Sequence, residues 1–222
     1  MNIFDIMGPV MVGPSSSHTA GAVRIGRMAR RLLGEGTPKE AAITLYGSFA
    51  ATGEGHGTDR ALVAGLLGMQ TDDERIASSY DWAEKEGMAF SFSRAKGSGE
   101  HPNTARIDLV SKSGKTLSMT AASLGGGRIT VTELDGLCVS FSGDLPTLIV
   151  QNEDTPGHVS AVSTMIAQTN VNLATMQLYR DYPGGNAVMI VEMDKTIPKE
   201  ALDLLRQRKG IQHVTFIDSS ES

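Results

Sequence analysis

The chain has 222 residues, 40% of them hydrophobic and 20% charged, and a formal net charge of −5. This length can bury a real core, as one large domain or two small ones. The acidic pI, near 5.5, gives no basic footprint for nucleic acid. No apolar run approaches the roughly 20 residues that a membrane helix needs.

The N-terminal segment and the cysteine content indicate a compartment. The segment lacks the basic stretch of a secretory signal. Cys138 is the only cysteine, so an internal disulfide is impossible. One thiol also cannot hold a zinc ion or an iron–sulfur cluster, which take about four ligands. We therefore expect a cytoplasmic protein whose own residues bind no metal.

The first two thirds of the chain mix helical and strand-like patterns. Helical spacing of apolar residues predicts helices over residues 18–33, 61–67 and 73–85. Short apolar segments predict strands over residues 41–50, 89–93, 106–110, 116–120 and 129–134. Turn residues at 113–115 and 125–127 suit hairpins. This order predicts an α+β domain.

The pattern changes at Ser142–Pro146, where we place a boundary between domains 1–144 and 147–222. The second domain shows predicted strands over 147–151, 172–180, 187–193 and 211–217, and helices over 156–168 and 198–208. The order βαββαβ is ferredoxin-like. Thr155 is predicted as a helix N-cap and Pro156 as the first helical residue.

The stretch Asn152–His158 (NEDTPGH), with the helix after it and Thr169–Asn172, resembles an ACT domain. ACT domains typically pair through their sheets and bind small effectors, often amino acids, at the loop before the first helix. The resemblance implies Asp154, Gly157 and His158 as effector-binding residues, and free N–H groups at a helix start can receive a carboxylate. Assembly alone is an equally open role. By position alone, His158 is expected to be an exposed polar residue.

The segment Gly13–Gly21 (GPSSSHTAG) precedes the first predicted helix. A serine at this place is a good N-cap, but three hydroxyls exceed what a cap requires. Together with a positive helix end they make a receptor for a carboxylate or phosphate. The more specific alternative is a Ser–His hydrolase, which needs a carboxylate to orient the histidine and an oxyanion hole. The sequence has no G-x-S-x-G elbow of the kind that holds such a serine.

A second motif, Thr52–Asp59 (TGEGHGTD), is rich in glycine. His56 lies between two glycines with little local cover, so we do not expect a buried core histidine. Its near-neutral pKa suits acid–base chemistry. A tight turn capped by Thr58 and Asp59 is the structural alternative. His101 and His213 are predicted to be structural or surface residues, and no histidine pair has metal-binding spacing.

Four segments together resemble the β chain of the two-chain, iron–sulfur-dependent bacterial L-serine dehydratase. They are residues 4–9 (FDIMGP), 13–21 (GPSSSHTAG), 46–49 (YGSF) and 55–59 (GHGTD). The C-terminal ACT-like domain also fits that chain. The large N-terminal domain resembles the allosteric substrate-binding domain of some D-3-phosphoglycerate dehydrogenases.

In that family L-serine becomes pyruvate and ammonia without pyridoxal phosphate, and a [4Fe–4S] cluster with one open iron position acts as Lewis acid. The cluster cysteines belong to the α chain, which agrees with the single cysteine of this sequence. The resemblance implies an L-serine ammonia-lyase subunit that needs its cluster-bearing α chain. It further implies L-serine as substrate and self-association through the ACT domain. From the charge and the short apolar runs we expect neither nucleic acid nor membrane as partner.

The resemblance also implies site residues. Catalytic roles fall to His56 as the base at the α-carbon, Thr58 as a positioning group and His18 as the second imidazole. Carboxylate binding and loop orientation fall to Ser15, Ser16, Ser17 and Thr19. A histidine is a weak base for an α-proton unless a metal draws electron density from the substrate. Two alternatives stay open: an allosteric serine site with catalysis wholly in the α chain, and a free-standing amino-acid sensor.

Overall fold

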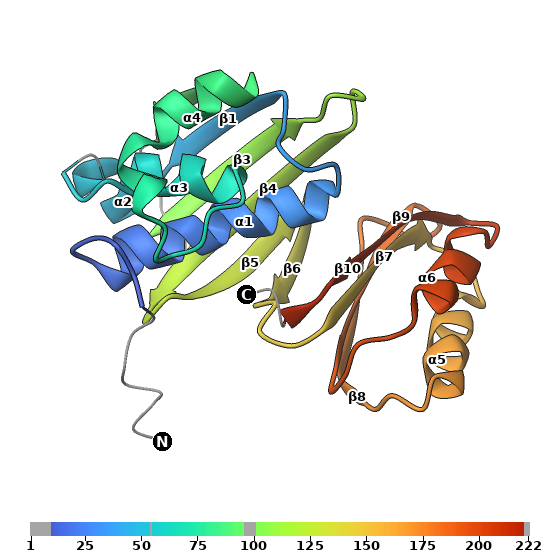
Figure 1. Ribbon diagram of the computed structural model, residues 1–222. Helices are drawn as coiled ribbons and strands as arrows, with labels where there is room; N and C mark the ends of the chain where they lie inside the picture. Colours follow the sequence, from blue (N-terminus) through green and yellow to red (C-terminus); the bar gives the residue numbers. More distant parts are fainter. Residues whose placement is uncertain (1–9, 54, 96–100, 220–222) are drawn as a thin grey trace. The chain divides into compact units, whose positions relative to one another are not determined.

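The computed structural model describes residues 10–53, 55–95 and 101–219 (Figure 1). The chain divides into two compact units between Gly136 and Leu137, and each unit mixes helices with a sheet. The predicted α+β class is confirmed. The proposed boundary at 144–147 lies one strand further along, after β6 (Leu137–Phe141), and stays a prediction.

The first sheet has six strands in the order β2-β1-β3-β4-β5-β6. The other five are β1 (Glu40–Leu45), β2 (Ala89–Arg94), β3 (Thr104–Val110), β4 (Thr116–Gly125) and β5 (Arg128–Leu134). β1 pairs in parallel with β2 and antiparallel with β3. The hairpins predicted after β3 and β4 are confirmed. β6 was not expected from the sequence.

The strand predicted over residues 41–50 is wrong in its second half. β1 ends at Leu45, and Gly47–Thr52 forms a short helix, α2. Gly47 has φ +54°, which a strand does not accommodate. Its Cα also lies so close to Pro102 that a Cβ would stand 2.4 Å from the Pro102 carbonyl oxygen. The backbone at Gly47 therefore turns the chain out of the sheet.

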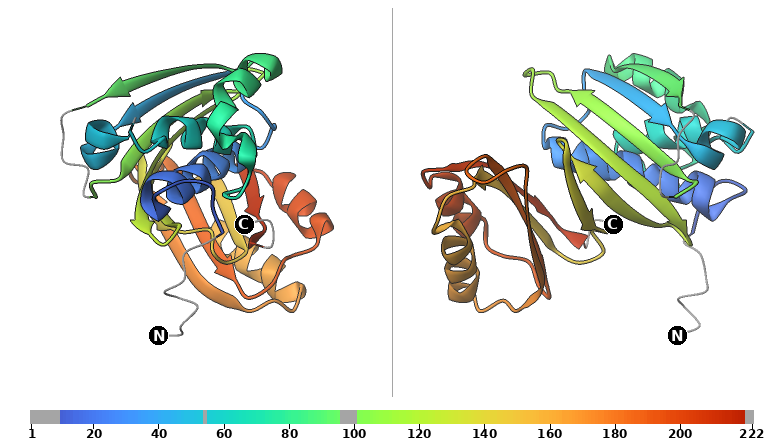
Figure 2. Two further views of the ribbon diagram at one scale, coloured as in Figure 1. Left: turned by 60° about the vertical axis from the view of Figure 1, so that its left-hand side comes forward. Right: turned by 180° about the vertical axis from the view of Figure 1, so that it is seen from behind.

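Helices cover one face of the six-stranded sheet, as the front and rear views show (Figures 1 and 2). They include α1 (Gly21–Leu33), α3 (Thr58–Leu66) and α4 (Ser79–Glu86). α1 packs on β3, β4 and β5, and α3 packs on α1. Residues 74–78, predicted as α-helix, form a 3-10 turn, η3, before α4. No described helix combines the length and apolar character needed to cross a membrane.

Two glycines let α1 and α3 approach each other closely. A Cβ at Gly26 would lie 2.3 Å from the Leu62 carbonyl oxygen, and one at Gly65 would lie 2.1 Å from that of Val23. Those distances are far below ordinary contact, so any side chain would force the helices apart. The glycines thus fix where α3, which begins at Thr58, lies against α1.

The C-terminal unit has the predicted βαββαβ order, with an antiparallel sheet arranged β10-β7-β9-β8. Its elements are β7 (Thr147–Glu153), α5 (His158–Gln168), β8 (Leu173–Arg180), β9 (Asn186–Met193), α6 (Lys199–Arg206) and β10 (Ile211–Ile217). Both helices pack against one core, which contains Leu148, Val162, Met189 and Leu205. The ferredoxin-like prediction is confirmed.

The start of α5 differs from the prediction. The helix begins at His158, and its N-cap is Gly157 rather than Thr155. Gly157 has φ +102°, outside the helical region, so Pro156 cannot be the first helical residue. The loop before α5 is therefore two residues longer than the sequence predicts.

Candidate active site

The GPSSSHTAG segment folds as a π-helical turn, η2 (Ser16–Ala20), that leads into α1. The Ser15 Oγ accepts a hydrogen bond from the His18 N–H at 3.2 Å, so Ser15 caps this turn. Ser16 and Ser17 are half-buried, and neither hydroxyl has a hydrogen-bond partner among the described residues. Within the described part of the chain, two of the three serines thus keep their hydroxyls available.

Thr19 lies beneath the loop rather than on its surface. It is buried, and its hydroxyl has no hydrogen-bond partner in the described part of the chain. A Cβ at Gly13, which has φ +137°, would stand 2.6 Å from the Thr19 Oγ1. Gly13 therefore covers Thr19.

His18 is the centre of the site, and both of its ring nitrogens have hydroxyl partners. Nδ1 lies 3.0 Å from the Thr58 Oγ1, and Nε2 lies 3.2 Å from the Ser48 Oγ. The ring also meets Phe49 edge-on at 5.2 Å between centroids. These contacts fix the imidazole in position and orientation.

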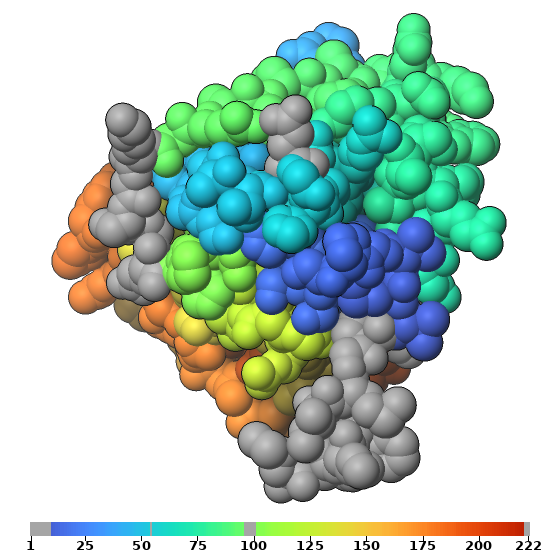
Figure 3. All heavy atoms as spheres, turned by 90° about the vertical axis from the view of Figure 1, so that its left-hand side faces the viewer, coloured from blue at the N-terminus to red at the C-terminus, as the bar shows by residue number. Residues whose placement is uncertain are grey.

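Three separate elements contribute to this cluster. His18 comes from η2, Ser48 from α2, and Thr58 is the fully buried first residue of α3. The space-filling view shows the dark blue N-terminal segment beside the cyan segment that contains α2 (Figure 3). Ser48 is held there because its N–H donates to the Pro102 carbonyl.

Burial is the largest cause that lowers the pKa of His18 below its usual 6.5, and the charge of His56 lowers it further. The lowered pKa favours the neutral imidazole of His18 at pH 7. A neutral ring carries one N–H donor and one acceptor nitrogen, which matches its two hydroxyl partners.

His56 differs from His18 in its surroundings. Its side chain is exposed, as the flanking glycines predicted, and its ring lies 5.0 Å from that of His18. The ring nitrogens have no hydrogen-bond partner among the described residues. Of the two imidazoles, His56 is thus the one that is accessible to a molecule bound from solvent.

The hydrolase alternative finds no support in the described residues. The group behind His18 is the Thr58 hydroxyl, where a Ser–His–Asp arrangement needs a carboxylate. Asp59, the adjacent carboxylate, instead accepts a hydrogen bond from the Tyr80 hydroxyl at 2.7 Å. Ser48, which sequence reasoning gave no role, is the serine next to the imidazole. The only signal for it was the YGSF segment with its glycine.

The predicted effector residues lie around the start of α5. Asp154 accepts hydrogen bonds from the Gly184 N–H at 3.0 Å and from Arg180 at 3.1 Å, and these two donors lower the pKa of its carboxyl. Its carboxylate therefore ties down the β8–β9 turn.

The expectation that His158 is exposed is wrong. Its side chain is only 7% exposed, and its Nε2 lies 3.0 Å from the Thr155 Oγ1. The reason is Gly210, whose missing side chain leaves room for the ring: a Cβ there would stand 2.7 Å from it. The other nitrogen, Nδ1, has no hydrogen-bond partner among the described residues.

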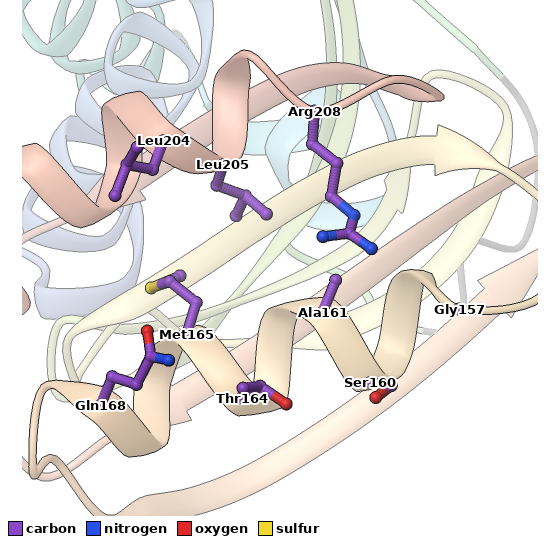
Figure 4. Close-up of a pocket in the computed structure, with 9 residues that line it drawn as sticks. All are labelled: Gly157, Ser160, Ala161, Thr164, Met165, Gln168, Leu204, Leu205 and Arg208. Carbon is purple, nitrogen blue, oxygen red and sulfur yellow. The ribbon is translucent and has the colours of Figure 1, made fainter.

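A hollow of about 470 Å³ lies between α5 and α6 (Figure 4). Ser160, Thr164 and Met165 line it from α5, and Leu204 lines it from α6. The Arg208 side chain points across from the segment after α6 toward α5. Arg208 also borders a second hollow of about 360 Å³, which contains Thr155, His158 and Lys209.

The described residues do not fit an iron–sulfur cluster. Cys138 is the single thiol and lies exposed on β6. Within residues 10–53, 55–95 and 101–219, no group of three His, Cys, Asp or Glu side chains is placed to hold a metal ion. Such a cluster takes about four ligands.

Comparison with known proteins defines first the class of each unit. Residues 2–86 match the family model "Serine dehydratase beta chain", and residues 146–210 match the model "ACT domain". The N-terminal match ends with α4, so it contains both site motifs. The class is thus a serine dehydratase β-type domain followed by an ACT domain.

Similar proteins define the family more narrowly. The "Probable L-serine dehydratase, beta chain" of Bacillus subtilis is 43% identical over 216 residues, which is 97% of each chain. The "L-serine dehydratase, beta chain" of Peptoniphilus asaccharolyticus is 34% identical over 87% of each chain. A D-3-phosphoglycerate dehydrogenase of Methanocaldococcus jannaschii is 28% identical over 50% of this chain and 21% of its own. This chain belongs to the L-serine dehydratase beta-chain family, as the four segments had indicated.

Proposed function

We propose that this chain is the β subunit of an L-serine ammonia-lyase and that His56 removes the α-proton of L-serine. The observation that supports this role is the pairing of two imidazoles with unlike environments. His18 has both nitrogens engaged, whereas His56 is exposed and 5.0 Å away. A general base needs a free lone pair within reach of its proton.

The substrate carboxylate is assigned to the loop before α1. The hydroxyls of Ser16 and Ser17, which have no partner among the residues that the structure describes, supply donors, and the positive end of the helix favours an anion. Ser15 supports the loop by capping it, and Thr58 positions the site through His18. Thr19, beneath Gly13, belongs to the support of the loop in this proposal.

A [4Fe–4S] cluster is proposed for a partner α chain, since the described residues of this chain do not fit one. Names of relatives that include "beta chain" support a two-chain enzyme. In such an enzyme the β subunit would bind and orient L-serine and accept its proton. We further propose a cytoplasmic enzyme that is inactive without its α chain.

The decisive experiment is anaerobic co-expression of both chains and assay on L-serine, with L-threonine for comparison. His56→Ala is expected to lower kcat by about 10²- to 10⁴-fold, because a positioned acid–base group contributes that much. Serine binding and the brown cluster colour should remain. His101→Ala is the matched control, because His101 also lies in a loop but accepts its hydrogen bond from the neighbouring Asn103 N–H.

Two results would contradict the proposal. A retained maximal rate with altered cooperativity in His56→Ala would make the site allosteric, with catalysis wholly in the α chain. A chain that never co-purifies with a cysteine-rich, coloured partner would instead be a free-standing sensor.

We also propose that the C-terminal unit binds an amino-acid effector and pairs with a second copy of itself. The observation that supports effector binding is the hollow beside α5, where Arg208 and Lys209 border the start of a helix without a side-chain cap. Pairing is proposed from the match to the ACT-domain family model alone. Arg208→Ala is expected to abolish any effect of added amino acids on the rate while leaving the basal rate unchanged. An unchanged amino-acid response in that variant would contradict the proposal.

A further inference from the structure

A run of hydroxyl groups continues beyond His18. The Ser48 Oγ, which contacts the His18 Nε2, also lies 3.3 Å from the Thr52 Oγ1. The Thr52 hydroxyl in turn donates to the Ser48 carbonyl oxygen at 3.0 Å. The order along this run is therefore Thr58, His18, Ser48, Thr52 and the backbone.

The number of protons fixes the direction of each hydrogen bond. A hydroxyl has one proton to donate, and that of Thr52 is used on the Ser48 carbonyl. Between Ser48 and Thr52 the donor must then be Ser48. With its own proton used, Ser48 can only accept from His18.

The same count of protons determines which nitrogen of the His18 ring is protonated. A neutral ring that donates from Nε2 has an unprotonated Nδ1, so the Thr58 hydroxyl donates to Nδ1. We propose that Ser48, backed by Thr52, is a positioning residue that holds His18 in its Nε2–H tautomer. In this state neither nitrogen of His18 has a free lone pair. His18 orients the site and leaves proton removal to His56.

The backbone around Ser48 is built to place this hydroxyl. Gly47, at φ +54°, packs on Pro102, and the Ser48 N–H donates to the Pro102 carbonyl. Phe49 follows in a fully buried position against the His18 ring. The turn that ends β1 early therefore sets both groups against the imidazole.

Nitrogen-15 NMR of the labelled full-length chain tests this assignment directly, because a protonated and an unprotonated ring nitrogen resonate far apart. Signals of His18 are identified by their loss in His18→Gln. At pH 8 the wild type is expected to show a protonated Nε2 and an unprotonated Nδ1. Ser48→Ala and Thr52→Val should both admit the Nδ1–H form, the first by removing the acceptor and the second by freeing the Ser48 proton.

Ser93→Ala is the matched control. It removes one hydroxyl of the exposed Thr44–Ser93 pair in the same unit, and the His18 tautomer should not change. Ser48→Thr keeps the hydroxyl and should restore the Nε2–H form. If Ser48→Ala does not fold, Thr52→Val decides, because Thr52 is exposed. A wild type with mainly Nδ1–H, or no tautomer change in Thr52→Val, would overturn the proposal.

The catalytic consequence rests on the proposed function. In the assembled enzyme, Ser48→Ala is expected to lower kcat at least about tenfold with a smaller effect on KM, and Ser48→Thr to recover most of it. A tautomer change without any lyase activity in the wild-type pair would refute the proposed function alone. Full activity in Ser48→Ala, with its tautomer altered, would refute the positioning role alone.

Discussion

Each unit of the molecule has a buried histidine with one ring nitrogen 3.0 Å from a threonine hydroxyl, but the two are built differently. His158 contacts Thr155, three residues earlier, and its other nitrogen has no partner among the described residues. His18 contacts Thr58 and Ser48, which are 40 and 30 residues away. The first arrangement is local, while the second depends on how three elements pack.

The largest expected effect comes from separating the elements around His18. Gly65→Ala would place a Cβ 2.1 Å from the Val23 carbonyl oxygen and push α3, with Thr58 at its start, away from α1. We expect the free energy of unfolding to fall by about 3 kcal/mol. Denaturant unfolding measures it.

Gly55→Ala is the control for this substitution, since its Cβ would meet nothing nearer than 3.7 Å. The NMR signals of the His158 ring should stay unchanged in Gly65→Ala, while those of His18 move. A loss below about 1 kcal/mol would show that the α1–α3 contact adapts, and would weaken the contrast between the two histidines.

A smaller effect is expected at His158. Gly210→Ala combines strain at φ +84° with a Cβ 2.7 Å from the imidazole, and we expect a loss of about 2 kcal/mol. Gly184→Ala separates the two causes, because Gly184 has φ +80° with nothing within 4 Å. Equal losses in thermal or denaturant unfolding would mean that the His158 contact costs nothing.

The smallest expected effect is on the pH dependence of stability. The pKa of His18 in the folded chain lies below the 6.5 of the unfolded chain, because of burial and then the charge of His56. The contribution of His18 to the free energy of unfolding is complete above pH 6.5. It is lost as the pH falls, because the His18 ring takes up a proton in the unfolded chain before it does so in the folded chain. The free energy of unfolding should therefore fall more between about pH 7 and 5 in the wild type than in His18→Gln.

His101→Gln provides the comparison for that series, because His101 takes part in a short loop contact with Asn103 and lies outside the run of hydroxyls around His18. Its curve should parallel that of the wild type. If the pH dependence of stability in His18→Gln also parallels that of the wild type, the environment of His18 does not favour the neutral ring.

Much of the fold could be predicted from local patterns. The βαββαβ order, the hairpins after β3 and β4, and the apolar face of α1 were correct, because helical and strand periodicity record which face is buried. Two of the errors lie where a single backbone angle outweighs propensity. Gly47 ends β1 early, and Gly157 delays α5.

The sequence by itself determined the family, the two domain types and the motifs that contain His18, Ser15 and His56, because these are contiguous runs of residues. Only the tertiary structure decided that Ser48 and Thr58 meet the two nitrogens of His18, and that Gly210 buries His158. The physical reason is the sequence separation over which each interaction acts. Periodicity and capping act within a few residues, whereas a hydrogen bond between α2, η2 and α3 exists only once Gly26, Gly65 and Pro102 have set those backbones against their neighbours.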